Sequence, residues 1–157
     1  MAATPATAAL ERAGIEFTVH TYEAPTGDDI SYGEAVAAAL GVPAGRVFKT
    51  LVAMVDGAPA VAIVPVIGTL ALKSLARARA GKKAAMADPA DAERLTGYVT
   101  GGISPFAQRR RLPMIADQTL MEFETVFVSG GRRGIQVEVS PLDLLELTAA
   151  EVAPIAG

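Results

Sequence analysis

Residues 45–66 read GRVFKTLVAMVDGAPAVAIVPV, and this stretch constrains the fold more than any other part of the sequence. Two apolar runs flank Asp56-Gly57, a dipeptide that favours the tight turn of a β-hairpin. Successive side chains of a strand point to opposite faces, and both faces of the first run are mostly apolar. That pattern is typical of a strand that is covered on both sides. The stretch therefore predicts a hairpin inside a sheet, with protein packed on either face.

Lys49 interrupts this apolar strand. It shares a face with Leu51 and Ala53, so its ammonium group either reaches water at the end of the strand or points into a site. In the first case the aliphatic stem lies along the core and only the charged head is solvated. The strand alone favours this structural interpretation but leaves the functional one open.

Composition limits the classes of protein that this chain can belong to. Its 157 residues, 51% of them hydrophobic, predict a single globular domain over residues 1–157. The formal charge of −3 argues against a broad basic face for nucleic acid, although a local basic patch remains compatible with it. There is no cysteine, which excludes disulfides, thiolate metal sites and a cysteine nucleophile.

The sequence shows no targeting or membrane signal. The N-terminal residues lack the basic stretch and apolar core of a signal peptide. The longest apolar runs have the length of a strand and fall well short of the roughly 20 residues that a membrane span needs. We therefore expect a cytoplasmic protein that has no contact with a membrane.

Helix-start signals and alternating segments divide the rest of the chain. Four starts are expected: Thr4-Pro5, Ser31 with Glu34 in capping-box spacing, Asp88-Pro89 and Ser140-Pro141, while Thr69 is expected to cap a further helix that ends at Gly81. Further strands are expected within residues 15–23, 82–87, 113–117, 124–130 and 135–140. Several strand pairs are joined too closely for parallel crossovers. The prediction is an α+β domain with a mixed, mostly antiparallel sheet flanked by helices.

Most familiar catalytic arrangements are missing. The single histidine, His20, cannot build the usual two- or three-histidine metal site. A histidine within a strand is also more often a structural residue than a catalytic base. No Gly-x-Ser-x-Gly elbow, dinucleotide fingerprint or phosphate-binding loop is present. If the chain is an enzyme, we expect no metal, no cofactor and no conventional nucleophile.

Lys49 and the loop at residues 97–105, GYVTGGISP, remain as candidate chemistry. Glycines let the backbone approach a ligand, so the N–H groups of such a loop can converge on an anion or a polarised carbonyl. An ordinary surface turn explains the same residues equally well. Three basic runs, Arg109–Arg111, Lys82-Lys83 and Arg132-Arg133, are either solvated loop ends or a local footprint for phosphates.

Five motifs carry a resemblance to a known family. These are HTYE, VFKTLV, TGYVTGGISP, RRRLP and VSGGRRG, in this order along the chain. Together they resemble the YbaK/EbsC family of trans-editing aminoacyl-tRNA deacylases nearly from end to end. The resemblance implies the fold of the YbaK and prolyl-tRNA synthetase-associated editing domain. It also implies an enzyme that hydrolyses the ester between a wrong amino acid and tRNA(Pro), because a synthetase pocket discriminates weakly between near-isosteric amino acids.

The resemblance also implies a set of site residues. Lys49 matches the family lysine that faces the aminoacyl end of the tRNA, and Gly101 begins a Gly-x-x-x-Pro loop that would hold the carbonyl region of the substrate. The expected catalytic residues are Lys49 and Gly101, and the expected substrate-binding residues are Tyr22, Tyr32, Thr50, Gly102, Ser129 and Gln136. Gln136 is a departure, because the best-known member of the family has aspartate at this position. An amide would hold the ammonium group of a substrate less strongly than a carboxylate.

Cys-tRNA(Pro) is the preferred substrate that the resemblance implies, with prolyl-tRNA synthetase as a partner. The thiol of the substrate could then attack its own ester, so the enzyme would need only positioning and electrostatics. Two alternatives remain: a sister deacylase for alanyl or seryl esters, and a non-catalytic module that binds tRNA or the synthetase.

Overall fold

The computed structural model describes residues 3–24 and 32–157. In chain order the helices and strands are α1 (Pro5–Arg12), β1 (Thr18–Thr21), α2 (Tyr32–Leu40), β2 (Phe48–Val55), β3 (Ala58–Pro65), α3 (Leu72–Ala78), β4 (Ala84–Met86), α4 (Pro89–Thr96), β5 (Met114–Asp117), β6 (Val126–Arg132), β7 (Ile135–Val139), α5 (Pro141–Thr148) and β8 (Glu151–Ala153). Two 3₁₀ turns, η1 (Ala44–Arg46) and η2 (Gln118–Glu122), precede β2 and follow β5.

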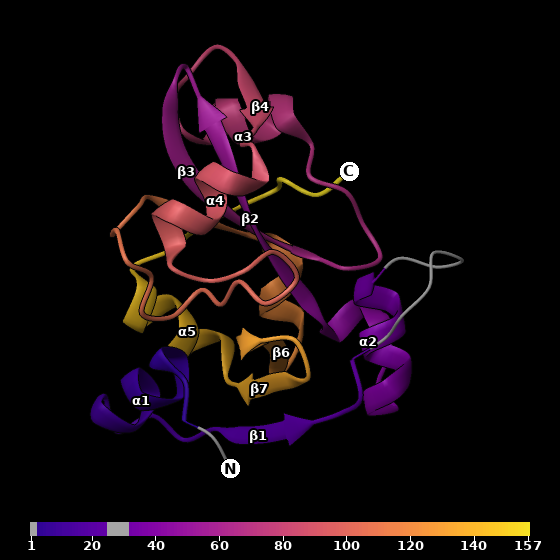
Figure 1. Ribbon diagram of the computed structural model, residues 1–157. Coiled ribbons are helices and arrows are strands. Elements are labelled where there is room, and N and C mark those ends of the chain that lie inside the picture. The colour runs from indigo at the N-terminus through magenta and orange to yellow at the C-terminus, as the bar shows by residue number, and fades with distance from the viewer. Residues whose placement is uncertain (1–2, 25–31) are drawn as a thin grey trace.

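The strands form two sheets (Figure 1). One has the order β4-β2-β3-β5-β8, and the other has the order β1-β7-β6. The pairs β3–β5 and β5–β8 are parallel and the remaining pairs are antiparallel. The predicted α+β class with mostly antiparallel pairing is confirmed, while the division into two sheets is an addition that the local sequence did not indicate.

The predicted hairpin forms the centre of the larger sheet. β2 and β3 pair along their whole length, from Phe48 opposite Pro65 to Val55 opposite Ala58. The turn residues Asp56 and Gly57 both have positive φ, as a tight hairpin turn requires. Alternate residues of both strands enter different hydrophobic clusters, so the sheet is buried on both faces as expected.

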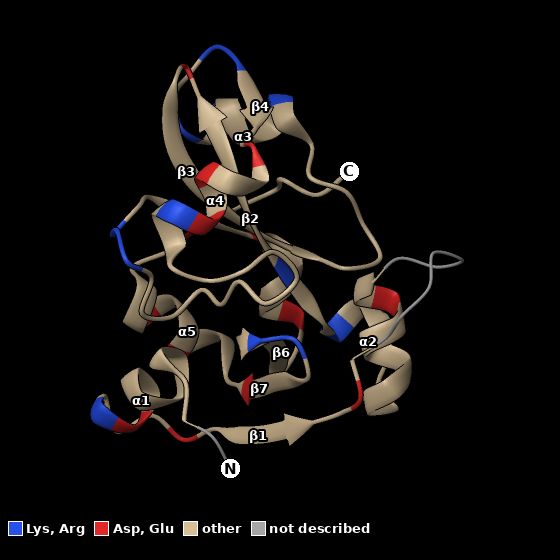
Figure 2. Cartoon of the chain, viewed as in Figure 1, with Lys and Arg blue, Asp and Glu red and all other residues tan. Residues whose placement is uncertain are grey.

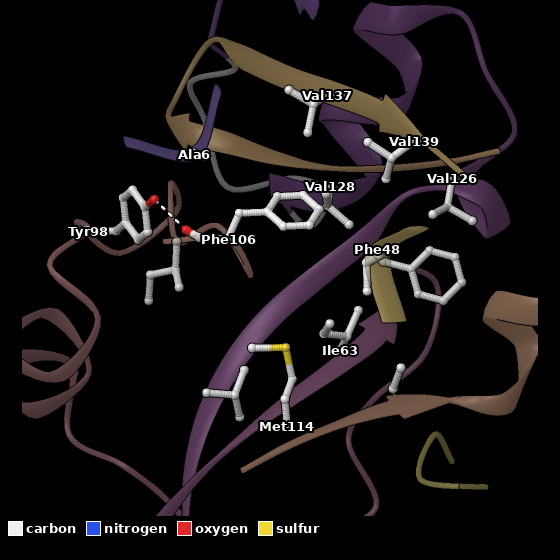
Figure 3. Packing of buried hydrophobic residues seen from close by; sticks show 14 of the residues in the cluster. Ala6, Phe48, Ile63, Tyr98, Phe106, Met114, Val126, Val128, Val137 and Val139 are labelled. Atoms are coloured by element: carbon white, nitrogen blue, oxygen red, sulfur yellow. Dashed lines mark hydrogen bonds between the residues drawn. The ribbon is translucent and has the colours of Figure 1, made fainter. Parts of the chain in front are cut away.

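The two sheets share a hydrophobic core. Figure 3 shows Phe48, Ile63 and Met114 from the larger sheet together with Val128 and Val137 from the smaller one. Among the described residues, the backbone connection between the two sheets is one isolated parallel bridge, Val47 to Phe127. Side-chain packing, rather than a continuous hydrogen-bond ladder, therefore sets the relative position of the two sheets.

Capping chemistry explains two of the helix starts, and a third was predicted wrongly. Thr4 and Thr7 form a capping box on α1, and the hydroxyl of Ser140 accepts from the amide of Asp143 at the start of α5. Thr69 does not cap a helix, because its backbone and hydroxyl pair with Gly157. α3 instead begins after Ala71. The capping box predicted at Ser31 lies outside the described residues.

The C-terminal segment is joined to β5 through a buried carboxylate. Asp117, only 2% exposed, accepts hydrogen bonds from the amides of Ile155 and Ala156 at 2.9 Å each. It also accepts from the hydroxyl of Thr119 at 2.6 Å. Strand β8, which sequence analysis did not predict, adds to the sheet next to β5 just before this attachment. Among the described residues, no helix is long and apolar enough to cross a membrane.

Candidate functional site

A cavity of about 390 Å³ lies where the two sheets, α2, α4 and the glycine-rich loop meet. Its lining is mostly apolar, with a few polar side chains, which is the usual character of a small-molecule pocket. The residues that line it are Tyr32, Gly33, Val36, Val47, Phe48, Lys49, Thr50, Leu51, Val52, Val66, Met86, Ala87, Pro89, Ala92, Thr100, Gly101, Ile103, Ser129 and Gln136.

Strand β2 provides one wall of the cavity through consecutive residues. β4 pairs only with Ala53–Val55, so in the described structure the N-terminal half of β2 has an edge without a strand partner. The cavity follows this edge, which is why both Lys49 and its neighbour Thr50 line it although their side chains leave opposite faces of the strand. Lys49 is partly buried and forms no ion pair with another described residue. The hydroxyl of Thr50 is buried without a hydrogen-bond partner.

The smaller sheet provides the opposite polar wall. Ser129 on β6 and Gln136 on β7 are directly paired, so their side chains lie on the same face. The amide Nε2 of Gln136 donates weakly to the hydroxyl of Tyr22 at 3.5 Å. Its carbonyl Oε1 is buried without a partner. The unpaired oxygen is a hydrogen-bond acceptor that is ready for a donor entering the cavity.

Tyr32, in the first turn of α2, contributes a third buried polar atom without a partner. Burial and, to a lesser extent, the nearby Tyr22 raise the pKa of Tyr32 to about 12 against the opposing effect of Arg133. The two tyrosine hydroxyls lie close enough to interact, but the hydroxyl of Tyr32 has no hydrogen bond of normal geometry. Tyr32 therefore stays neutral at physiological pH and can both donate and accept.

The glycine-rich loop is packed against the turn between β6 and β7. Gly101 has φ +88°, and a Cβ atom at this position would lie 2.5 Å from Nε of Arg133. A Cβ atom on Gly102 would lie 2.7 Å from the Cα of Arg132. The amide of Thr100 donates to the carboxylate of Glu93 at 2.8 Å, and the hydroxyl of Tyr98 donates to the carbonyl of Phe106 at 2.6 Å (Figure 3). Glycine is favoured at Gly101 by its positive φ and at Gly102 by the close backbone of Arg132. The loop is held at both ends.

Six of the eight residues that sequence analysis selected line the cavity: Lys49, Gly101, Tyr32, Thr50, Ser129 and Gln136. Tyr22 lies behind Gln136 and contacts it, and Gly102 is buried under the β6–β7 turn without lining the cavity. Sequence analysis missed the wall formed by Met86, Ala87, Pro89 and Ala92, whose apolar side chains carry no distinguishing signal.

His20 lies outside the cavity lining, in a separate cluster. Its Nε2 is 2.9 Å from Oε1 of Glu138, and the other carboxylate oxygen of Glu138 accepts from Thr125 and Arg46. The hydrogen bond from Thr125 is the main cause that lowers the pKa of Glu138, with His20 and Arg46 adding to it against the effect of burial. This cluster connects β1, β6, β7 and η1.

The basic runs lie at different places. Arg110 and Arg111 line a shallow hollow with Arg79, and the backbone amides of Lys82 and Lys83 donate to Asp56. Arg132 and Arg133 lie at the β6–β7 turn beside the cavity (Figure 2). Of the described residues, no three histidine, aspartate or glutamate side chains are grouped so that they could hold a metal ion.

The cavity can therefore bind a small polar group and stabilise developing negative charge. One ammonium group, three buried polar atoms for which the described residues provide no partner, and a fixed glycine loop surround the same space. Each buried polar atom without a partner costs about 1–3 kcal/mol of stability. Such groups are explained when a ligand supplies the missing hydrogen bonds.

Comparisons with known proteins identify the family of this chain. A profile of the aminoacyl-tRNA editing domain matches residues 28–147. The chain is 38% identical to EbsC of Enterococcus faecalis, a candidate Cys-tRNA(Pro)/Cys-tRNA(Cys) deacylase, over 85% of this chain and 82% of EbsC. It is 31% identical to the multifunctional Ser/Thr-tRNA deacylase ProXp-y of Escherichia coli K12, over 92% of this chain and 87% of that protein.

The same relationship is found among solved structures. The crystal structure of a candidate trans-editing enzyme for prolyl-tRNA synthetase superposes with a TM-score of 0.84 at 25% identity. The superposition covers 100% of this chain and 99% of that chain. The profile match covers most of the chain, and the relatives align over most of their own length. The chain belongs to the aminoacyl-tRNA editing domain family.

Proposed function

We propose that this protein is a deacylase that hydrolyses the ester of mischarged tRNA(Pro), with cysteinyl-tRNA(Pro) as the preferred substrate. Residues 1–157 would act as one editing domain, since α1 and β8 lie outside the profile match yet pack or pair with the rest of the fold. The cavity is the main support for the proposal. An ammonium group and three polar atoms that lack a hydrogen-bond partner among the described residues surround a space of about 390 Å³. The names of the relatives support this class of substrate.

In this proposal Lys49 acts by electrostatic stabilisation. Its ammonium group faces the oxygen that gains negative charge when the ester carbonyl is attacked. The glycine loop holds the carbonyl region, and Gln136 Oε1, Thr50 and Tyr32 receive the polar groups of the amino acid. With a cysteinyl ester, the substrate thiol forms a bond to the carbonyl carbon while the bond to the ribose oxygen breaks. The thiol proton passes to the ribose oxygen, and a cyclic thiolactone leaves.

A sister activity on seryl or threonyl esters is the second candidate. Gln136 supports it, because an amide stands where the best-known member of the family has a carboxylate, and the Escherichia coli relative is named for Ser/Thr-tRNA. These esters lack a thiol, so water would be the attacking group. The positioning residues would keep the same roles.

Prolyl-tRNA synthetase is the proposed partner, and the cytoplasm the proposed place of action. The chain carries a net charge of −3, so we expect weak intrinsic affinity for tRNA. Selectivity for tRNA(Pro) would then come from the synthetase. A marked preference of the isolated protein for tRNA(Pro) over other cysteinylated tRNAs would contradict this.

Deacylation of tRNA(Pro) charged separately with Cys, Ala, Ser, Thr and Pro tests the function. We expect rapid loss of the cysteinyl ester, stable prolyl-tRNA(Pro), and loss of activity in Lys49→Ala. Lys73→Ala is the matched control, because Lys73 is an exposed lysine on α3 that does not line the cavity. Preferential cleavage of seryl or threonyl esters would favour the sister activity, and no cleavage of any ester would overturn the proposal.

A further inference from the structure

Arg133, at the turn between β6 and β7, is an exposed residue that contacts two residues lining the cavity. Its guanidinium lies over the ring of Tyr32, 4.9 Å from the ring centroid. Its Nε donates to the carbonyl oxygen of Thr100 at 3.3 Å. Tyr32 and Thr100 both line the cavity, so one exposed arginine joins the α2 wall to the glycine loop at the entrance.

The position of this side chain is fixed by its surroundings. The absence of a side chain on Gly101 leaves the space in which Nε of Arg133 lies, since a Cβ atom there would come within 2.5 Å of it. The guanidinium also contacts the Tyr32 ring, a cation–π contact that favours this position of the side chain. Arg133 is therefore better ordered than most exposed arginines, whose side chains lose much entropy when they bind.

Most of the hydrogen-bonding capacity of Arg133 remains available. A guanidinium carries five N–H donors, and only Nε is used by another described residue. Arg133 is exposed as a whole, and the planar geometry of its terminal nitrogens matches two oxygens of a phosphate group. Lys49 is partly buried in the cavity wall on β2, whereas Arg133 is exposed and lies outside the lining, so the site has one cation in its wall and one on its solvent side.

We propose that Arg133 binds the phosphate that joins the terminal nucleotide of the tRNA to the nucleotide before it. This inference rests on the proposed function, which places the aminoacyl ester inside the cavity. The ester is attached to the ribose of the terminal nucleotide, and the first anionic group along the chain from that ribose is this phosphate. Arg133 holds it at the entrance, and Lys49 is left to act on the ester.

The test compares two forms of the substrate, one with the normal terminal phosphodiester and one with an uncharged methylphosphonate at that linkage. With the wild-type protein, we expect the methylphosphonate to raise KM about tenfold and to leave kcat nearly unchanged, since a hydrogen-bonded ionic contact is lost. Arg133→Gln should raise KM by a similar factor on the normal substrate. It should show no further increase on the methylphosphonate, because the two changes remove the same contact.

Arg132→Gln is the matched control. Arg132 is an adjacent exposed arginine in the same turn, and only its backbone is recorded against the glycine loop. This variant loses the same charge and should retain the tenfold discrimination between the two substrates. If Arg133→Gln still discriminates as the wild type does, or if it lowers kcat equally on both substrates, Arg133 is a structural connection between α2 and the loop and the proposal is wrong.

A binding measurement separates this inference from the proposed function. The probe is a short single-stranded RNA ending in CCA, with either the normal or the methylphosphonate terminal linkage. We expect tighter binding of the normal form by the wild type and equal binding of both forms by Arg133→Gln. This outcome supports the contact between Arg133 and the phosphate even if no ester is hydrolysed. If esters are hydrolysed but the normal and methylphosphonate forms bind equally well to the wild type, the phosphate contact is wrong and the proposed function stands.

Discussion

Two regions of this molecule bury polar side chains, and they treat them in opposite ways. Asp117 is almost fully buried, and its carboxylate accepts hydrogen bonds from the hydroxyl and amide of Thr119 and from the amides of Ile155 and Ala156. In the cavity, Tyr32, Thr50 and Gln136 each bury an oxygen that has no partner. One region is complete by itself, and the other is complete only when a ligand is bound.

The difference separates residues kept for stability from residues kept for function. A fully satisfied buried carboxylate stabilises the folded state, and its removal leaves other groups unpaired. An unpaired hydroxyl or carbonyl lowers stability, so its retention is explained by binding. Substitutions in the two regions should therefore change different measurements.

The largest expected effect is on activity, at Lys49. Lys49→Met keeps the aliphatic stem and removes the charge. We expect kcat for deacylation to fall about 10²- to 10³-fold, the usual effect of removing one group that stabilises an oxyanion. The free energy of unfolding, measured by urea denaturation, should stay within about 0.5 kcal/mol of wild type, because Lys49 forms no ion pair with a described residue. If Lys49→Met instead lowered the free energy of unfolding by several kcal/mol, Lys49 would stabilise the fold as Asp117 does, and the two regions would not differ in this respect.

The next largest effect is on stability, at Asp117. Asp117→Ala leaves the amides of Ile155 and Ala156 unpaired, and we expect the free energy of unfolding to fall by about 3 kcal/mol. The kcat should be unchanged at a temperature where the variant is folded. Glu122→Ala, an exposed carboxylate in the adjacent η2, is the control and should have little effect. A similar loss in both variants would mean that the buried network contributes nothing specific.

Asp117 also predicts a dependence of stability on pH. Burial disfavours its charged form, but the hydrogen bonds from Thr119, Ala156 and Ile155 outweigh burial and hold the pKa of Asp117 below its ordinary value. Because the pKa is lower in the folded state, the contribution is full above the unfolded pKa of about 3.9 and is lost as the pH falls through the folded pKa. The stability difference between wild type and Asp117→Asn should shrink below about pH 4. A constant difference down to pH 2 would contradict the assignment.

A smaller and opposite effect is expected at Thr50. Thr50→Val removes a buried hydroxyl that has no partner and keeps the shape of the side chain. We expect the free energy of unfolding to stay equal or to rise by up to about 1 kcal/mol. The kcat/KM for the preferred substrate should fall about tenfold. If Thr50→Val lowers the free energy of unfolding instead, the hydroxyl of Thr50 has a hydrogen-bond partner within the protein. The polar groups of the cavity would then stabilise the fold, as those around Asp117 do.

The smallest effect concerns Gln136. Gln136→Asp replaces the amide with a carboxylate, and an ionised acceptor binds an ammonium group about twice as strongly as a neutral one. We expect KM to fall by roughly threefold, together with a small loss of stability from burying a charge. The measurement is steady-state deacylation alongside urea denaturation. An unchanged KM would show that Gln136 does not contact the ammonium group.

Local sequence signals predicted much of the fold because their physics is local. The Asp56-Gly57 turn, the Thr4 capping box and the Ser140 cap depend on neighbouring residues, and all three are found. The prediction that Thr69 caps a helix failed because the backbone and hydroxyl of Thr69 pair instead with Gly157, at the distant C-terminal end. Strand β8 was missed for a related reason, since it is three residues long and is defined by pairing with β5.

The site was predictable only in part. Lys49 could be recognised because it is a charged residue in an apolar strand. The glycine loop could be recognised because several glycines in a short segment indicate an unusual backbone conformation. The position of Arg133 above Tyr32 and Gly101 depends on three segments that are far apart in the sequence. No spacing rule connects them, so Arg132-Arg133 could be recognised as a basic pair but not assigned to the entrance.

The packing between the two sheets provides a way to change the shape of the cavity from the interior. The cavity walls belong to separate sheets, which within the described residues share one backbone bridge, at Val47 and Phe127, while a shared core sets their spacing. Val128 and Ile63 lie in that core and do not line the cavity. We expect a change of side-chain volume at either residue to shift one wall relative to the other. The amino acid that the cavity accepts would then change while every residue that lines the cavity stays the same.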